Sequence, residues 1–248
     1  HIQISFWANE LGLNWFRQLF HHRAMTPKSP LSFCDELWAS RDAEAHEVAD
    51  GLFLGSVRAA TDMRKVEGWK ISRILTVDTT SSMLWPNKIT YKRVKLDDTP
   101  LANLLQVLPE ALAFIGEAQL RRCPILVHCS RGVSRSASVV IAYLMLSKGL
   151  SYEAARSHVE RKRPVIYPNL GFEVQLKHLE SLAAGAPSGH WGEKLKWLRA
   201  AMASCSYDVL GAMRQPLRSR LTQARCQAVE ALGKEQQLLQ RRLAWRSL

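Results

Sequence analysis

Long apolar runs are missing from this sequence. Hydrophobic residues make up 47% of its 248 positions, yet no stretch approaches the roughly 20 consecutive apolar residues that a membrane-spanning helix requires. Paired cysteines are missing too: the five cysteines are odd in number, widely scattered and without a CxxC pair. They predict neither a disulfide framework nor a zinc site. We therefore expect no membrane span, no metal, and a reducing setting, either cytoplasmic or nuclear.

Acidic residues are also scarce, with 22 Asp and Glu against 34 Lys and Arg, which gives a net charge of +12. Such a charge suits nucleic acid, an acidic membrane surface or phosphorylated substrates, and by itself does not choose among them. Much of the excess lies after residue 190. Basic residues in such a tail are more often a solvated face than a dedicated nucleic-acid site, so we expect no nucleic-acid partner.

Composition divides the chain into three parts. Residues 1–44 are interpreted as a leader or flexible segment, with an organelle transit peptide over 1–24 as the alternative, because acids are scarce there and aromatic residues recur at helical spacing. Residues 45–184 form the predicted domain, which the small, flexible stretch 183–189 closes. Residues 190–248 predict a basic helical extension. We favour a helix packed on the domain, and a partner helix through 217–246 is the alternative.

Apolar periodicity predicts alternating strands and helices within 45–184. β-branched and apolar runs predict a strand with a turn at 48–55 and strands at 71–77, 91–96 and 124–128. The run at 124–128 lacks polar alternation, as is typical of a buried parallel strand. Helical spacing, caps and breakers predict helices at 57–67, 104–120, 136–146, 151–163 and 169–182.

The informative motif is His128-Cys129-Ser130-Arg131-Gly132-Val133-Ser134-Arg135-Ser136, between the buried strand and a buried helix. A loop in this position turns several backbone N–H groups inward, and the following helix adds its positive dipole end. Together they form a cradle for a phosphate dianion. The same field stabilises a thiolate, so we expect Cys129 to be a nucleophile near neutral pH.

The remaining motif residues support this chemistry. The planar fork of Arg135 binds two phosphate oxygens, which a lysine would do poorly. Gly132 permits a positive φ or a close approach to the ligand, and Ser136 is placed to donate to the Cys129 sulfur when that sulfur leaves. The predicted phosphate-binding residues are Ser130, Arg131, Gly132, Val133, Ser134 and Arg135.

Proton donation to the leaving oxygen requires a carboxylic acid near the cradle. Asp97 and Asp98 follow a predicted strand and precede the long helix at 104–120, on a loop that can fold over the cradle. We rank Asp98 above Asp97 as the general acid.

The string His-Cys-x-x-Gly-x-Ser-Arg-Ser resembles the motif of dual-specificity protein phosphatases, over about residues 45–184. The resemblance implies a central, mainly parallel sheet flanked by helices, no metal or other cofactor, and hydrolysis through a phosphocysteine. It gives Cys129, Arg135 and Asp98 their roles and assigns His128 to tuning the nucleophile. Supporting matches are Gly51–Gly55, Ile74–Val77, Val94–Asp98, Ala142–Met145 and Arg163–Phe172, which includes Asn169, a residue expected to brace the phosphate loop.

The sequence thus predicts a compact protein phosphatase acting on phosphotyrosine and phosphoserine or phosphothreonine in phosphoprotein substrates. Two alternatives stay open. One is a phosphatase of phosphoinositides, RNA ends or glucans, and Arg131, where many members have alanine, adds charge in that direction or points to solvent. The other is a phospho-binding scaffold, which would be favoured by loss of the cysteine, arginine or acid. All three are present.

Overall fold

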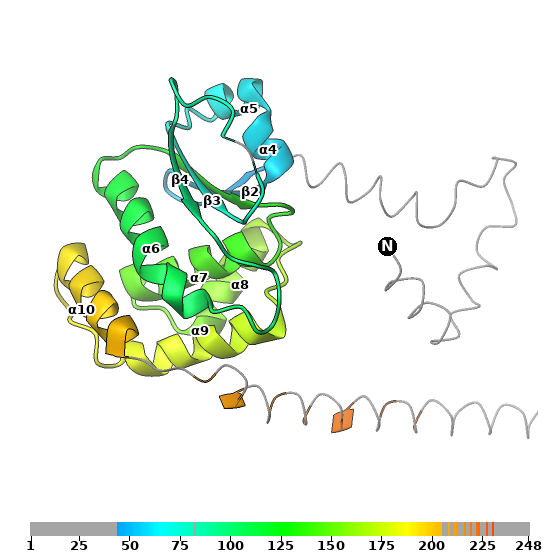
Figure 1. The fold of residues 1–248 in the computed structure, drawn as a ribbon, viewed down its shortest axis with the longest axis vertical. Coiled ribbons are helices and arrows are strands. Elements are labelled where there is room, and N and C mark those ends of the chain that lie inside the picture. The colour runs from blue at the N-terminus through cyan, green and yellow to red at the C-terminus, as the bar shows by residue number, and fades with distance from the viewer. Residues whose placement is uncertain are drawn as a thin grey trace, which may run out of the picture. The chain divides into compact units, whose positions relative to one another are not determined.

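A mixed sheet of five strands lies at the centre of the fold, in the order β1-β2-β5-β3-β4 (Figure 1). The computed structural model describes residues 44–81 and 83–204, with scattered positions from 208 to 230. Only β1 runs antiparallel to its neighbour, so the sheet is mainly parallel, as predicted. The strands are β1 (His46–Ala49), β2 (Leu52–Ser56), β3 (Arg73–Val77), β4 (Thr90–Val94) and β5 (Ile125–Cys129).

Helices cover both faces of this sheet. One apolar cluster joins the sheet to the longer helices, and a second joins its other face to the segment around Val66. The central strand β5 is therefore buried along its whole length, which explains its apolar run without alternation. The helices are α4 (Val57–Thr61), α5 (Met63–Gly68), α6 (Leu104–Leu120), α7 (Arg135–Lys148), α8 (Tyr152–Lys162), α9 (Leu170–Ala183) and α10 (Trp191–Ser204).

Two predicted elements differ from the structure. The single strand with a turn expected at 48–55 is a hairpin of two strands, because Gly51 adopts a φ of +65° between β1 and β2. The helix expected at 57–67 is broken at Asp62, whose backbone is extended and whose carboxylate accepts hydrogen bonds from the amides of Arg64 and Lys65. An aspartate that caps a new helix competes with continuation of the preceding one.

The later helices begin and end where their caps predict. Ser151 accepts a hydrogen bond from the amide of Ala154 at the start of α8, and Asn169 caps α9 in the same way. Gly149, in the left-handed conformation, ends α7. These residues fix where α8 and α9 begin and where α7 ends.

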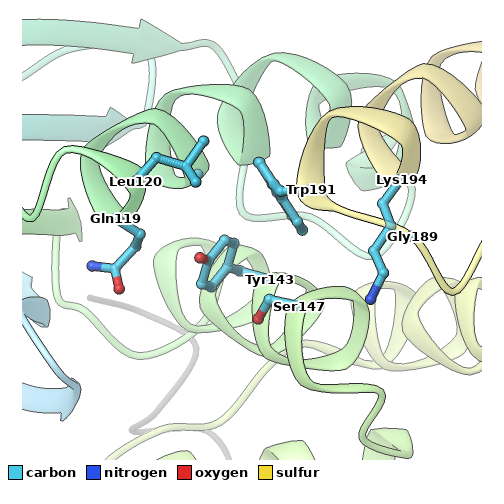
Figure 2. A pocket seen from close by; sticks show the side chains of 8 residues that line it. Gln119, Leu120, Tyr143, Ser147, Gly189, Trp191 and Lys194 are labelled. Atoms are coloured by element: carbon cyan, nitrogen blue, oxygen red, sulfur yellow. The ribbon is translucent and has the colours of Figure 1, made fainter.

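Helix α10 packs on the helices that cover the sheet. Leu198 is fully buried, and the Lys194 ammonium donates to the carbonyl of Leu146 at the end of α7 over 2.9 Å. Trp191 meets Tyr143 edge to face, with ring centroids 5.1 Å apart (Figure 2). A hollow of about 250 Å3 lies between α6, α7 and the start of α10. None of the predicted site residues lines it.

Other predictions concern residues that the structure does not describe. The leader or transit segment falls on residues before 44, and most of the partner helix expected at 217–246 also lies outside the described residues. Within the described ranges, no helix is both long enough and apolar enough to cross a membrane.

Gly116 of α6 makes room for Trp191, and this contact gives a stability prediction. A Cβ at Gly116 would lie 1.6 Å from Nε1 of Trp191. Gly116→Ala should therefore lower the free energy of unfolding by about 1–3 kcal/mol through overpacking, although alanine is the better helix former by about 1 kcal/mol. Gly68→Ala, with no atom within 4 Å of the new methyl group, is the matched control. Urea unfolding that gives both variants the same stability would contradict this account of α10 docking.

Candidate active site

The loop between β5 and α7 forms a cradle at the carboxyl edge of the parallel strands. Gly132 adopts a φ of +69°, and a Cβ there would lie 2.3 Å from the carbonyl oxygen of Gly55. Only glycine fits such a position. The outward carbonyls of the loop are hydrogen-bonded: Val57 donates to Ser130 over 3.2 Å, and Tyr167 donates to Val133 over 2.8 Å, both through their amides. The loop is therefore held from outside.

Cys129 lies at the bottom of this cradle and is 1% exposed. Its sulfur accepts a hydrogen bond from the amide of Gly132 and one from the hydroxyl of Ser136, each 3.2 Å long. Ser136 is fully buried in the first turn of α7, so the positive end of that helix also faces the sulfur. Two donors and a helix N-terminus stabilise a negatively charged sulfur.

Arg135 lies between the cradle and the loop that carries the predicted acid. Its guanidinium donates to the hydroxyl of Ser130 over 3.0 Å and to the carbonyl of Leu96 over 3.5 Å. Its Nε is 3.6 Å from Oδ2 of Asp98. The fork is thus placed at the mouth of the cradle, where phosphate oxygens would enter.

Asp98 is fixed beside the cradle through one of its two oxygens. Oδ1 accepts hydrogen bonds from the hydroxyl of Ser134 (2.6 Å) and from the side-chain amide of Asn169 (3.0 Å). The backbone amide of Asn169 donates to the same serine hydroxyl over 3.2 Å. Asp98, rather than its neighbour Asp97, makes these contacts. Asn169 therefore contacts both Ser134 of the phosphate loop and the carboxylate of Asp98.

The other predicted phosphate-binding residues lie around the same loop. Ser134 is buried, whereas Ser130 and Arg131 are exposed and Val133 is half-buried. The exposed Arg131 corresponds to the solvent-facing alternative from the sequence. Among residues 44–81 and 83–204, no cluster of His, Cys, Asp and Glu side chains could hold a metal ion.

Comparison with known proteins places this arrangement in a family. The model of the dual specificity phosphatase catalytic domain matches residues 52–181, which is more than half of the chain. The chain belongs to the dual specificity phosphatase family. Its domain is that of a cysteine-dependent protein phosphatase, as the sequence predicted.

Individual relatives agree with this assignment. Dual specificity protein phosphatase 1 of Arabidopsis thaliana is 40% identical over 133 residues, which are 54% of this chain and 67% of the relative. Dual specificity protein phosphatase 19 of Mus musculus is 38% identical over 136 residues, 55% of this chain and 62% of the relative. The crystal structure of human DUSP28 superposes with a TM-score of 0.55 at 33% identity and covers 57% of this chain and 95% of that one.

Arg163 lies behind the phosphate loop, although the sequence placed it only at the end of a predicted helix and at the start of a stretch that matches the family. It is fully buried. Its guanidinium donates to the carbonyls of Gly132 (2.9 Å) and Arg131 (3.1 Å) in the phosphate loop, and to that of Glu44 (3.0 Å). The same guanidinium donates to Nδ1 of His46, since burial and the Arg163 charge lower the pKa of that histidine and keep it neutral. Helical spacing carries no signal that brings Arg163 to a loop some thirty residues earlier.

His128 is buried beside the nucleophile in its neutral form. Nδ1 lies 3.3 Å from the carbonyl oxygen of Cys129 and Nε2 lies 2.9 Å from the hydroxyl of Thr76. Since a carbonyl only accepts, Nδ1 carries the proton and Nε2 accepts from the threonine. Burial lowers the pKa of His128, although the Cys129 carbonyl and the buried carboxylate of Asp78 oppose this. These contacts orient the backbone at Cys129.

Arg163→Lys tests the contribution of the buried guanidinium. Lysine keeps the charge but replaces the planar fork by a single ammonium group, so carbonyls of the phosphate loop lose donors. We expect unfolding to become easier by about 2–3 kcal/mol and competitive inhibition by inorganic phosphate to weaken about tenfold. Arg161→Lys, on the exposed side of the same helix end, is the control. Equal phosphate affinity in the two variants would refute a role for Arg163 in shaping the cradle.

His128 predicts a pH dependence of stability. Its pKa in the folded protein lies below the ordinary value of 6.5, so the unfolded chain takes up the proton first as the pH falls. Stability should thus be full above pH 6.5 and decline below it, with a slope of at most about 1.4 kcal/mol per pH unit. His128→Gln should remove this component. In urea unfolding between pH 5 and 8, the difference in unfolding free energy between parent and variant should therefore shrink as the pH falls. Parallel curves would contradict it.

Proposed function

We propose that this phosphatase removes phosphate from phosphotyrosine and from phosphoserine or phosphothreonine in protein substrates, with Cys129 as nucleophile and Asp98 as general acid. The observation that carries the proposal is the convergence of three groups on one cradle. The Cys129 sulfur lies at its base between two donors, the Arg135 fork lies at its mouth, and Asp98 lies across that fork. This is the arrangement that in-line transfer of a phosphoryl group requires.

The binding step uses the backbone of the phosphate loop. Its N–H groups and the start of α7 offer a dianion several donors without any rearrangement. Arg135 exchanges its present contacts with Ser130 and Leu96 for two phosphate oxygens. The Cys129 sulfur then faces the phosphorus atom on the side opposite to the ester oxygen.

The first chemical step forms a sulfur–phosphorus bond as the ester oxygen leaves. That oxygen takes a proton from Asp98. Because Oδ1 already accepts hydrogen bonds from Ser134 and Asn169, the transferable proton belongs to Oδ2, the oxygen that faces Arg135. The alcohol or phenol departs and leaves phosphocysteine.

The second step releases phosphate. The Asp98 carboxylate takes a proton from an attacking water, the phosphorus–oxygen bond forms, and the sulfur leaves as a thiolate. The hydroxyl of Ser136, 3.2 Å from the sulfur, donates to the developing negative charge. The Gly132 amide does the same, so both donors contribute most when the thiolate is free.

Leaving-group dependence tests the role of Asp98. Asp98→Asn keeps the shape of the side chain but has no proton of suitable acidity to give. Turnover of phenyl phosphate and of phosphotyrosine peptides should fall by about 10²–10³, whereas 2,4-dinitrophenyl phosphate, whose leaving group needs no proton, should lose less than about tenfold. Steady-state kinetics with chelator and reductant present gives both values. Equal losses on the two esters would transfer the acid role to Asp97.

Cys129→Ser and a substrate panel test the wider proposal. The serine variant should be inactive on every substrate, because its hydroxyl is not ionised at neutral pH. Phosphotyrosine and phosphothreonine peptides should be hydrolysed by the parent enzyme in preference to phosphoinositides and to RNA 5′ phosphates. A preference for either non-protein class would replace the substrate proposed here. A folded enzyme that binds phosphopeptides without turnover would favour the scaffold alternative.

A further inference from the structure

The loop that carries Asp98 is seated along helix α9, and one buried side chain of that helix makes most of the connections. Gln175 is fully buried, at the centre of α9. Burial of an amide is unfavourable unless its donors and its acceptor are all hydrogen-bonded. A buried Gln175 is therefore stable only if both ends of its amide find partners.

Gln175 uses both ends of its amide. Its Oε1 accepts hydrogen bonds from the amides of Leu104 (2.8 Å) and Leu105 (3.3 Å), two of the N–H groups at the start of α6 that have no partner within that helix. Its Nε2 donates to the carbonyl of Ala102 (2.9 Å) and to that of Gly171 in its own helix (3.1 Å). One side chain thus joins the end of the Asp98 loop, the start of α6 and α9.

The loop also lies directly on the surface of α9. A Cβ at Gly171 would be 1.7 Å from the carbonyl oxygen of Pro100, so the main chain of the loop occupies the place of a side chain. One residue before α9 begins, the Asn169 amide donates to Oδ1 of Asp98. Asn169, Gly171 and Gln175 hold residues 98–105 at three successive points.

We propose that Gln175 is a positioning residue for the general acid, which holds the loop of residues 97–103 in its working position before substrate binds. Gln175 itself does not touch the substrate. This inference rests on the role of Asp98 as the acid that is proposed above. With the loop held at Ala102 and at the start of α6, Oδ2 of Asp98 stays beside Arg135, and protonation of the leaving group needs no closing movement. Loss of the tether should slow the steps that need the acid and spare those that do not.

The decisive comparison is between leaving groups. Gln175→Leu has a similar volume but leaves the amides of Leu104 and Leu105 and the Ala102 carbonyl without this partner. We expect turnover of phenyl phosphate to fall by about 10-fold or more, since misplacement of a catalytic group by about 1 Å can cost up to about 10². Turnover of 2,4-dinitrophenyl phosphate should fall by less than about threefold, because that ester needs no proton from Asp98.

Two further variants keep the test informative if Gln175→Leu folds poorly. Gln175→Glu keeps an acceptor for the helix amides and loses the donor to the carbonyls of Ala102 and Gly171, so it should show a smaller discrimination between the esters. Gly171→Ala leaves Gln175 in place and pushes the loop away at Pro100, so it should reproduce the selective loss on phenyl phosphate. Ser151→Ala, which removes the cap of α8, is the control for lost stability and should slow both esters equally or not at all.

The double variant with Asp98→Asn separates the two proposals. If Gln175 acts through Asp98, adding Gln175→Leu to Asp98→Asn should not increase the discrimination between the esters any further. Absence of discrimination in Asp98→Asn alone would overturn the proposed acid and leave Gln175 without a function in catalysis. Discrimination in Asp98→Asn with an equal loss on both esters in the Gln175 and Gly171 variants would overturn the positioning role alone.

Discussion

The phosphate loop can face a dianion with its N–H groups only if its carbonyls find donors on the other side. Backbone N–H and C=O groups point in opposite directions, so a loop that aims the first inward aims the second at the protein. Here the buried Arg163 guanidinium serves the carbonyls of Arg131 and Gly132, and the amides of Val57 and Tyr167 serve those of Ser130 and Val133. These hydrogen bonds keep the loop preorganised for the dianion. The remaining features of the site depend on that geometry.

The parallel sheet brings these donors together. Strands β2 and β5 run side by side with Ser56 opposite Cys129, so the helix that follows β2 begins beside the phosphate loop and supplies the Val57 amide. The main chain at Gly55 approaches Gly132 so closely that no side chain fits at Gly132. Burial of β5 on both faces holds the nucleophile at a fixed depth.

Helix α9 links the two halves of the proposed chemistry. Its N-cap residue, Asn169, contacts both Ser134 of the phosphate loop and the Asp98 carboxylate. Its interior residue Gln175 holds the end of the acid loop. Helix α9 thus positions both the phosphate loop and Asp98. This arrangement favours a short, nearly fixed distance between the bound phosphate and the proposed acid, so that no loop has to close over the substrate.

Local chemistry explains what the sequence determined by itself. Cap residues, left-handed glycines and apolar periodicity act within a few positions, so helices α6 to α9, the parallel strands and the motif from His128 to Ser136 were predictable, and Asp98 was chosen by its place after a strand. The break at Asp62 was missed because a capping aspartate outweighed an apolar pattern. Tertiary structure alone decided that Arg163 lies behind the phosphate loop and that Gln175 is hydrogen-bonded to the end of the loop that carries Asp98. Those contacts join residues 31 and 73 positions apart, and their energy comes from pairing buried polar groups, which no short-range pattern records.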